Sequence, residues 1–351
     1  MVSQRPSARR DGRMMNKRRR KKSLNRPHVS AYAASHPGRR ERNEDQWLIL
    51  DLTTGARGLV QEALEHDVGP HGTLLAVADG LGGAPAGEFA SALAVESLFR
   101  DLRGRVTAHT ALHLYYQAIK RANRWIWEVA QTDDMLHGMG ATLTTALIYH
   151  NWAYIAQIGD SRAYLVREGT CHQITEDQSL LHSMVTMGEL TPQEARFAPG
   201  RHVVLQALGT QPDVQIAITE IELQNDDVLV LCTDGLFHQV PADEIGQVVM
   251  TCQTPEAACR ELIRRALDRG GHDNITVVMA RLTGIIHRIP TFESPTTLRR
   301  LTVFDPGEIF QRNPELRRVV LAQARARLRR IYLIGALAVL LTLLLTVLAM
   351  L

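Results

Sequence analysis

The sequence feature that most restricts the fold of this chain is an apolar run that meets an aspartate and a glycine, a pattern that occurs four times. The junctions are Ala78-Asp79-Gly80, Ile158-Gly159-Asp160, Thr233-Asp234-Gly235 and, in reverse order, Gly271-His272-Asp273 before an apolar run. Short apolar runs bounded by glycine are typical of buried strands. We therefore expect the four aspartates to lie at strand ends along one rim, where glycine lets a ligand approach the backbone.

Carboxylates that converge on one spot repel each other, and a hard divalent cation relieves that repulsion. Oxygen ligands favour Mg²⁺ or Mn²⁺ over zinc. A single Asp-Gly pair is more often only a turn, so the prediction of a metal centre depends on the four junctions occurring together. Spacing alone does not separate Asp160 from the other three aspartates.

A fifth acidic site lies near the start of the chain, at Glu44-Asp45. Adjacent side chains of an extended segment point to opposite faces, so only one of these two carboxylates can bind a metal directly. Arg40 and Arg42 fall on the same face as Glu44. A guanidinium beside a metal centre is a natural bidentate partner for phosphate.

Periodicity predicts one α+β domain over residues 29–285, with strands in hairpin-like succession and helices between them. The strands are expected at Leu74–Ala78, Leu143–Tyr149, Ala153–Ile158, Val214–Ile218, Val228–Cys232 and Ile275–Ala280. The helices are expected at Glu88–Leu102, Leu112–Val129, Leu180–Met187, Glu244–Met250 and Pro255–Leu267.

Composition and motifs exclude several classes of protein. A hydrophobic content of 45% with 22% charged residues is ordinary for a globular protein and excludes a collagen, a coiled-coil rod or a mostly disordered chain. The sequence has no phosphate-binding loop of the Walker type and no Gly-x-Ser-x-Gly nucleophile elbow.

The two ends of the chain are basic, whereas its middle is acidic. Residues 1–26 carry eleven Lys or Arg and one acid, and residues 312–330 carry seven Arg and one acid, although the whole chain has a net charge of only +3. Residues 1–28 are predicted to form a disordered basic arm. The arm could bind anionic lipid or nucleic acid, or it could be a solvated tail without a partner.

The last 21 residues, 331–351, are uncharged and almost entirely apolar. A helix of that length spans about 31 Å, which matches the hydrocarbon core of a bilayer. Arginines immediately precede it, so the positive-inside rule predicts a single-pass tail anchor in the cell membrane with the preceding chain in the cytoplasm. Residues 286–330, which contain four prolines, are predicted to be a linker and a basic segment next to the inner leaflet.

Six motifs in order resemble those of the PP2C-type (PPM family) metal-dependent Ser/Thr protein phosphatases, bacterial branch. They are Gly38-x-Arg40-x-x-Asn43-Glu44-Asp45, Asp79-Gly80-Leu81-Gly82-Gly83, Met139-Gly140-Ala141-Thr142, Gly159-Asp160-Ser161-Arg162, Thr233-Asp234-Gly235 and Gly271-His272-Asp273-Asn274. The resemblance implies a four-layer α-β-β-α sandwich of two antiparallel sheets. It also implies that Leu180–Pro199 is a flap beside the active site.

The resemblance further implies a centre of two Mn²⁺ or Mg²⁺ ions. Asp79 would bridge them, Gly80 (through its carbonyl) and Glu44 would hold one ion, and Asp234 and Asp273 the other. Arg40 would bind the phosphate, and Asp45 and Asn274 would support the ligands from behind. Asp160 would be structural.

The activity implied is hydrolysis of phosphoserine and phosphothreonine by a water that bridges the ions, so that no covalent intermediate is needed. The expected partners are phosphorylated proteins, their cognate Ser/Thr kinases and the inner leaflet, with no specific nucleic acid.

Two positions depart from relatives of this type. His137 stands where bacterial relatives often have an aspartate that helps hold a third metal, so a third ion is left open, and His137 could equally be a surface residue without a role. Leu81 stands where animal members have a histidine proposed as the general acid. Two competing hypotheses are a phosphoprotein-binding pseudo-enzyme, although no metal aspartate is lost, and a nucleic-acid-binding membrane protein, although it has no aromatic stacking motif.

Overall fold

The computed structural model describes residues 26–59, 62–83, 85–198, 200, 203–285 and 298–307, together with 311, 318, 322 and 326. Its strands are β1 (His28–His36), β2 (Gln46–Asp51), β3 (Leu64–Asp67), β4 (Thr73–Ala78), β5 (Gly80–Leu81), β6 (Gly140–Ala141), β7 (Leu143–Tyr149), β8 (Trp152–Ile158), β9 (Arg162–Arg167), β10 (Thr170–Gln173), β11 (Ala217–Glu222), β12 (Val228–Cys232), β13 (Ile275–Thr283) and β14 (Leu298–Thr302). Its helices are α1 (Ala86–Leu102), α2 (Ala111–Ala130), the 3-10 turn η1 (Asp134–Leu136), α3 (Leu180–Thr186), α4 (Pro192–Phe197), α5 (Asp234–Phe237), α6 (Ala242–Thr251) and α7 (Pro255–Asp268).

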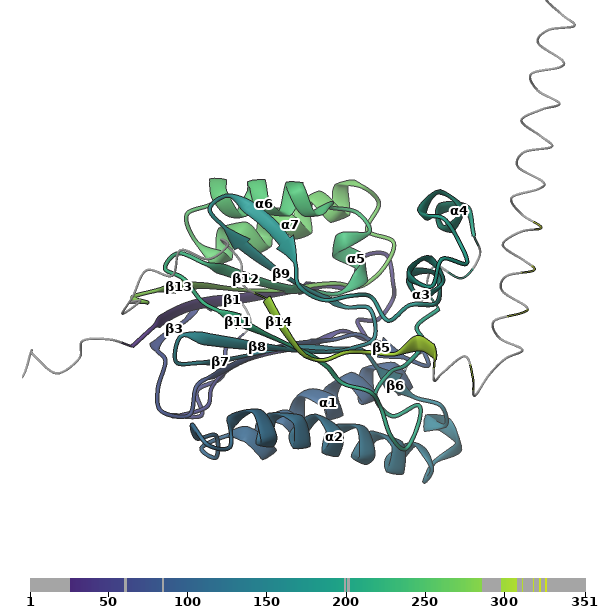
Figure 1. Cartoon of the computed structure of the whole chain (residues 1–351), viewed down its shortest axis with the longest axis horizontal. Coiled ribbons are helices and arrows are strands. Elements are labelled where there is room, and N and C mark those ends of the chain that lie inside the picture. Colours follow the sequence, from purple (N-terminus) through teal and green to yellow (C-terminus); the bar gives the residue numbers. More distant parts are fainter. Residues whose placement is uncertain are drawn as a thin grey trace, which may run out of the picture.

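Two six-stranded sheets pack face to face, and helices cover the outer face of each (Figure 1). The strand order is β10-β9-β12-β13-β1-β3 in one sheet and β14-β11-β8-β7-β4-β2 in the other. Every pairing within these two sheets is antiparallel. The predicted α-β-β-α sandwich of antiparallel sheets is therefore confirmed.

Three apolar layers hold the sandwich together. The middle layer lies between the sheets, and it contains Val29, Ile155 and Leu231. A second layer packs β4 and β7 against α1 and α2, and a third packs β12 and β13 against α6 and α7. Side chains alternate along each strand, so a central strand points one face at the other sheet and the other face at the helices. Both faces are therefore buried, as in β4 and β7.

The ends of several strands meet at one edge of the sandwich, and this is what positions the candidate site. β4 ends at Ala78 and continues into β5, which pairs with β6. β12 ends at Cys232, directly before α5, while the antiparallel β13 begins at Ile275 on the same edge. In Figure 1 this edge lies on the right, near the labels β5 and α5, with α3 and α4 beside it.

The prediction of a linker over residues 286–330 is wrong for residues 298–302, which form β14 and pair with β11. The linker was predicted from the four prolines, none of which lies within residues 298–302, and here Arg299 and Arg300 form ion pairs with Glu220 and Glu176. An edge strand has one unpaired side and tolerates such polar residues.

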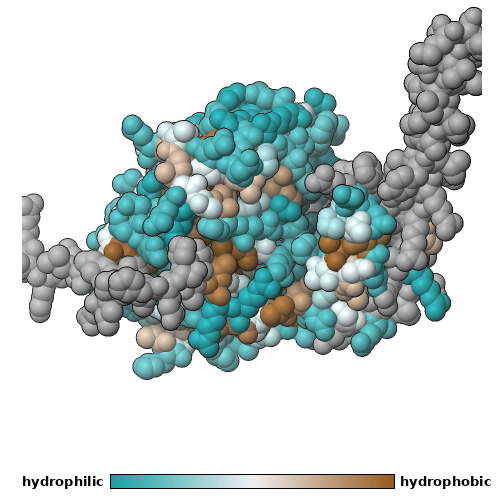
Figure 2. Space-filling model, turned by 45° about the horizontal axis from the view of Figure 1, so that its top comes forward, coloured by the Kyte–Doolittle hydropathy of each residue, from teal (hydrophilic) through white to brown (hydrophobic). Residues whose placement is uncertain are grey.

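The visible surface is mainly hydrophilic, and its apolar patches are small (Figure 2). Among the residues that the structure describes, no helix is long and apolar enough to cross a bilayer. The predicted span at 331–351 and nearly all of the predicted arm at 1–28 lie outside those residues.

Candidate metal centre

A wide cavity of about 760 Å³ opens at the edge where the strands end. Most of its lining is polar, and the predicted site residues dominate it. The lining consists of Arg40, Glu41, Arg42, Glu44, Asp79, Gly80, Leu81, Gly82, Gly83, Asp160, Val204, Asp234, His272, Asp273 and Asn274. Segments far apart in the sequence therefore contribute carboxylates to one hollow.

Asp79 and Gly80 join β4 to β5 at the floor of the cavity. The Asp79 amide donates to the Thr142 hydroxyl (3.0 Å), and the Thr142 amide donates to the Asp79 carbonyl (2.8 Å), so the neighbouring strand fixes this turn. The Gly80 amide donates to the Glu44 carbonyl (3.2 Å). A Cβ at Gly80 would collide with the backbone of Gly87, which explains why a glycine is needed here.

Glu44 and Asp45 point to opposite sides, as the extended backbone predicts. Glu44 lines the cavity, whereas Asp45 is only 4% exposed and accepts a hydrogen bond from the Thr233 hydroxyl (2.8 Å). The other carboxylate oxygen of Asp45, Oδ1, is buried without a hydrogen-bond partner in the described part of the chain. Asp45 therefore lies behind the cavity wall, next to the segment that carries Asp234.

Asp234 and Asp273 come from the opposite sheet. Asp234 begins α5 directly after β12, and its carboxylate lies 3.5 Å from the ring of His238 one turn later. Asp273 precedes β13 and accepts a hydrogen bond from the Arg40 guanidinium (2.9 Å). That hydrogen bond raises the pKa of Arg40 above its usual value. Arg40 keeps 60% of its side chain exposed, so it can still reach a ligand in the cavity.

Asn274 connects the two halves of the site. Its side-chain oxygen accepts a hydrogen bond from the Glu44 amide (2.8 Å), and its amide group donates to the carbonyls of Pro37 and Arg42 (both 2.9 Å). One side chain thus holds the loop that carries Arg40 and Glu44 against the strand that follows Asp273. These contacts make Asn274 a positioning residue and not a ligand.

Burial raises the pKa values of the carboxyl groups around this cavity. The pKa of Asp79 lies well above its usual range because of burial and because of the nearby Asp45 and Asp234. Burial is also the main reason that the pKa values of Asp45 and Asp160 rise to about 7, and it raises that of Glu44. The bare cavity therefore favours neutral carboxyl groups, and a bound cation would favour the charged ones.

The donor set fits a hard divalent cation. The cavity is lined by five Asp or Glu residues besides Glu41, and by Gly80, Asn274 and His272, and no cysteine is among its described lining residues. Within the described residues, no three His, Cys, Asp or Glu side chains converge closely enough to enclose one ion. Mg²⁺ commonly keeps several waters and binds through one or two carboxylates, so a dispersed set of acids in a wide cavity suits it.

Some residues that line the cavity were not predicted as site residues, and His137, which was considered as a metal ligand, does not line it. His272 and Glu41 line the cavity, and their proximity to Asp273 and Arg40 in the sequence was the available signal. Asp160, predicted to be structural, also lines it. His137 is exposed on the loop after η1 and is not among the lining residues, so its binding of a third metal stays a prediction.

Comparison with known proteins agrees with this arrangement. The model of the family described as protein phosphatase 2C matches residues 56–273. The chain belongs to the protein phosphatase 2C family. A serine/threonine phosphatase of Listeria innocua is 34% identical over 209 residues, which is 59% of this chain and 83% of that one. The serine/threonine protein phosphatase PstP of Mycobacterium tuberculosis is 37% identical over 232 residues, which is 64% of this chain and 43% of PstP.

Solved structures of protein phosphatase 2C relatives share the fold. The crystal structure of M. tuberculosis PstP superposes with a TM-score of 0.63 at 33% identity, covering 73% of this chain and 99% of that one. A structure of the PstP catalytic domain in complex with two manganese ions has a TM-score of 0.61 at 31% identity. The prediction of a metal-dependent serine/threonine protein phosphatase of the PP2C type is confirmed at the level of the family.

Proposed function

We propose that this PP2C phosphatase is a membrane-anchored enzyme that removes phosphate from phosphoserine and phosphothreonine in proteins, and that it opposes Ser/Thr kinases at the inner leaflet. The observation that carries the catalytic part is the convergence of Glu44, Asp79, Asp234 and Asp273 with Arg40 on one open cavity. The protein relatives that share this domain support the substrate class, since both are serine/threonine phosphatases.

In this proposal Asp79, Asp234, Asp273, Glu44 and the carbonyl of Gly80 hold two Mn²⁺ or Mg²⁺ ions, as the two manganese ions in the PstP structure suggest. When bound, such a pair supplies Lewis-acid catalysis and an activated water as nucleophile. Binding and orientation of the phosphate depend on the side chains of this chain.

Arg40 is placed to bind the phosphate oxygens. Its guanidinium has five N–H donors, and the hydrogen bond to Asp273 fixes its position at the cavity wall while most of the side chain stays exposed. A guanidinium in that position stabilises the charge that develops on the equatorial phosphoryl oxygens. Arg42 and His272 add further cationic or donor groups to the same wall.

The test of the catalytic proposal is phosphate release from a phosphothreonine peptide by the full chain with Mn²⁺, with Mg²⁺ and with EDTA. Asp234→Asn keeps the volume of the side chain but removes its charge, and it should lower metal-dependent turnover by more than about 100-fold. The matched control is Asp268→Asn, because Asp268 is exposed on α7, where it pairs with Arg264 on the surface.

Two results would contradict this proposal. The first is turnover that EDTA does not abolish, because the carboxylates would then act without a cation. The second is binding of the phosphopeptide without turnover in any metal, which would indicate the pseudo-enzyme; His137→Asp would then be the first variant to test for recovered activity.

Membrane anchoring is the second part of the proposal, and it is supported by the uncharged apolar segment 331–351 and the arginines before it. Such an anchor would raise the local concentration of the catalytic domain around membrane-bound phosphoproteins. Deleting residues 331–351 should move the protein from the carbonate-washed membrane fraction to the soluble fraction without loss of activity on a free phosphopeptide. Deleting residues 2–26 should leave it in the membrane. Retention of the first variant in membranes would overturn the anchor.

A further inference from the structure

Residues 298–307, which we call the strap, lie outside the part of the chain that matches the family and yet are attached to the catalytic domain. β14 pairs with β11 from Leu298 to Thr302 and thereby extends the second sheet at its edge. The Thr302 hydroxyl donates to the Ile216 carbonyl (2.6 Å), and the register shifts between Ile218 and Thr219. This irregularity interrupts the regular pairing near the end of β14.

The strap then contacts the flap, the segment that contains α3 and α4. Phe304 packs against a separate apolar cluster made of Leu180, Leu181, Met184, Leu190, Ala198 and Leu205. All of these residues except Leu205 lie in the flap, so Phe304 is an apolar connection between the strap and the flap. Arg300 forms an ion pair with Glu176, which lies just before α3.

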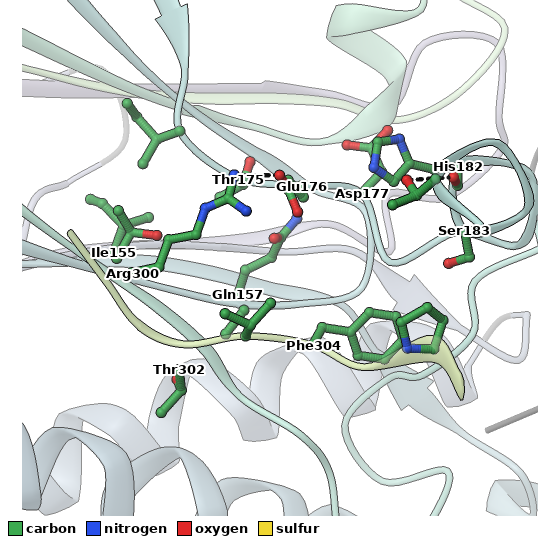
Figure 3. A pocket seen from close by; sticks show the side chains of 16 residues that line it. Ile155, Gln157, Thr175, Glu176, Asp177, His182, Ser183, Arg300, Thr302 and Phe304 are labelled. Carbon is green, nitrogen blue, oxygen red and sulfur yellow. Dashed lines mark hydrogen bonds and ion pairs between the residues drawn. The ribbon is translucent and has the colours of Figure 1, made fainter. Parts of the chain in front are cut away.

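Strap and flap enclose a cavity of about 70 Å³ (Figure 3). Phe304 and Arg300 approach it from the strap, while His182 and Ser183 approach it from α3, and Gln157 from β8. Because the space between them is small, the position of the strap restricts the position of α3.

Hydrogen bonds continue from the strap to the catalytic cavity. The Asp305 amide donates to Gln215 Oε1 (2.8 Å), and the Gln215 amide donates to Gln206 Oε1 (3.0 Å). Gln206 Nε2 donates to Gln178 Oε1 (2.8 Å), which also accepts from the amide of Gly159 (2.8 Å). Gln178 and Gln206 are buried, so each of these bonds is costly to lose.

Both ends of the flap adjoin the catalytic cavity. Gly159, at the end of the hydrogen-bonded series, directly precedes Asp160, which lines the cavity. Val204 also lines it, and Val203 beside it accepts the hydrogen bond of the Leu180 amide (2.9 Å) at the start of α3. A displacement of the flap therefore reaches the wall of the cavity at two points.

We propose that the strap positions the flap for protein substrates, so that residues 298–307 set the KM of the enzyme for a phosphoprotein. The inference rests on the proposed phosphatase function. In this proposal a phosphoprotein contacts the flap when it brings its phosphate to the carboxylates, whereas a small aryl phosphate does not, because no described residue of α3 or α4 lines the catalytic cavity. In the sequence, the strap lies between the catalytic domain and the predicted membrane anchor at 331–351.

The test compares two substrates in the full 351-residue chain in detergent micelles. Phe304→Ala removes the apolar connection and should raise the KM for a phosphorylated protein by about tenfold, while kcat for that substrate and the kcat/KM for p-nitrophenyl phosphate stay unchanged. Phe304→Leu should restore most of the affinity because it refills the cluster. The control is Met250→Ala, since Met250 is 60% exposed on α6 and does not line the cavity between strap and flap.

A measurement without catalysis keeps the inference testable even if the chain is not an active phosphatase. In Phe304→Ala, amide hydrogen exchange should accelerate across α3 and α4 and remain unchanged in β7 and β12. An unchanged KM together with unchanged exchange in α3 would overturn the proposal. Equal losses on both substrates would also overturn it, because they would indicate damage to the whole domain. Absence of p-nitrophenyl phosphate hydrolysis by the unaltered chain would instead contradict the proposed function.

Discussion

One amide side chain, that of Asn274, connects the two halves of the candidate site. Asn274 makes three hydrogen bonds that join the loop of Pro37, Arg42 and Glu44 to the end of β13. These bonds satisfy the Arg42 carbonyl and the Glu44 amide, and they give the Pro37 carbonyl a second donor besides the Arg40 amide (3.1 Å). Arg40, which we propose binds the phosphate, lies between these anchoring points in the sequence, so its position is set by Asn274 as well as by Asp273.

We predict that Asn274→Ala lowers kcat/KM by about 10- to 100-fold and raises the concentration of Mn²⁺ needed for half-maximal activity. The physical reason is that the loop carrying Glu44 and Arg40 loses its connection to Asp273. Steady-state kinetics with a phosphothreonine peptide and a Mn²⁺ titration measure both effects. Asn274→Asp keeps the acceptor for the Glu44 amide but loses two donors, so its defect should be intermediate. Equal activity of Asn274→Ala and the unaltered chain would remove Asn274 from the site.

Most of the carboxylates that reach the cavity were predictable from the sequence, but their individual roles were not. The alternation of an extended backbone separates Glu44 from Asp45, and the structure shows this separation. The Asp-Gly pattern marked Asp79, Asp160 and Asp234 alike, and all three line the cavity. Which of them binds an ion depends on side-chain directions to within a few tenths of an ångström, and a residue pattern does not encode these.

At the scale of the element, strands and helices with clear periodicity were predicted well. β7 and β12 have the predicted bounds, and the five helices agree to within two residues at each end. β9 was missed because it begins and ends with arginine. Its last residue, Arg167, is buried in an ion pair with Asp227 (2.6 Å), a partner sixty residues away that local sequence does not reveal.

β14 was missed for the same physical reason, because its arginines find partners only in the folded protein. The strand predicted at Val214–Ile218 is displaced to Ala217–Glu222. Gln206 and Gln215 hold the preceding residues outside the sheet through their mutual hydrogen bonds. Elements whose position depends on distant polar contacts are therefore the ones that periodicity does not find.

The first turn of α1 touches the site, and this makes Gly87 sensitive to substitution. A Cβ at Gly87 would meet the Glu44 carboxylate, which is the movable end of a side chain, and would also press on the backbone of Gly80. We predict that Gly87→Ala displaces Glu44 and raises the half-saturating Mn²⁺ concentration by about 10-fold or more. Alanine suits a helix, so α1 itself should remain intact.

The measurement is a Mn²⁺ titration of activity together with thermal unfolding in EDTA. Phe89→Ala is the control, since Phe89 is 42% exposed on the same turn of α1. Unchanged metal dependence in Gly87→Ala would mean that Glu44 does not take part in binding the ion, and the assignment of that residue would then have to be withdrawn.

At the scale of the whole molecule, the candidate site buries carboxyl groups, and folding has to overcome the cost of taking their charges out of water. Asp45, Asp79 and Asp160 are all buried near other carboxylates, and their pKa values are raised from a usual value of 3.8. The folded chain therefore binds protons that the unfolded chain releases. When the unfolded state binds fewer protons, the free energy of unfolding falls as the pH rises.

The direction and the pH window follow from these pKa values. For Asp45 the loss of stability begins above pH 3.8 and is complete above pH 7, at a rate of up to about 1.4 kcal/mol per pH unit. Arg264 and Arg265 lower the pKa of Glu261 to about 2, so Glu261 has the opposite effect on the free energy of unfolding. Its stabilising contribution is lost only as the pH falls below the usual pKa of 4.5. The pKa of His66 is lowered by burial, so His66 adds stability as the pH rises toward 6.5.

We predict that the EDTA-treated chain loses at least about 2 kcal/mol of unfolding free energy between pH 5 and pH 8 relative to Asp45→Asn. Both proteins contain His66 and Glu261, so the difference between them isolates Asp45. Saturating Mn²⁺ should abolish the loss in the unaltered chain, because a cation compensates the charges that protons compensate at low pH. Urea unfolding at four pH values measures these free energies. Equal pH dependence in the two proteins would show that Asp45 is already ionised in the folded chain without metal, and that the wall behind the cavity is more polar than its burial implies.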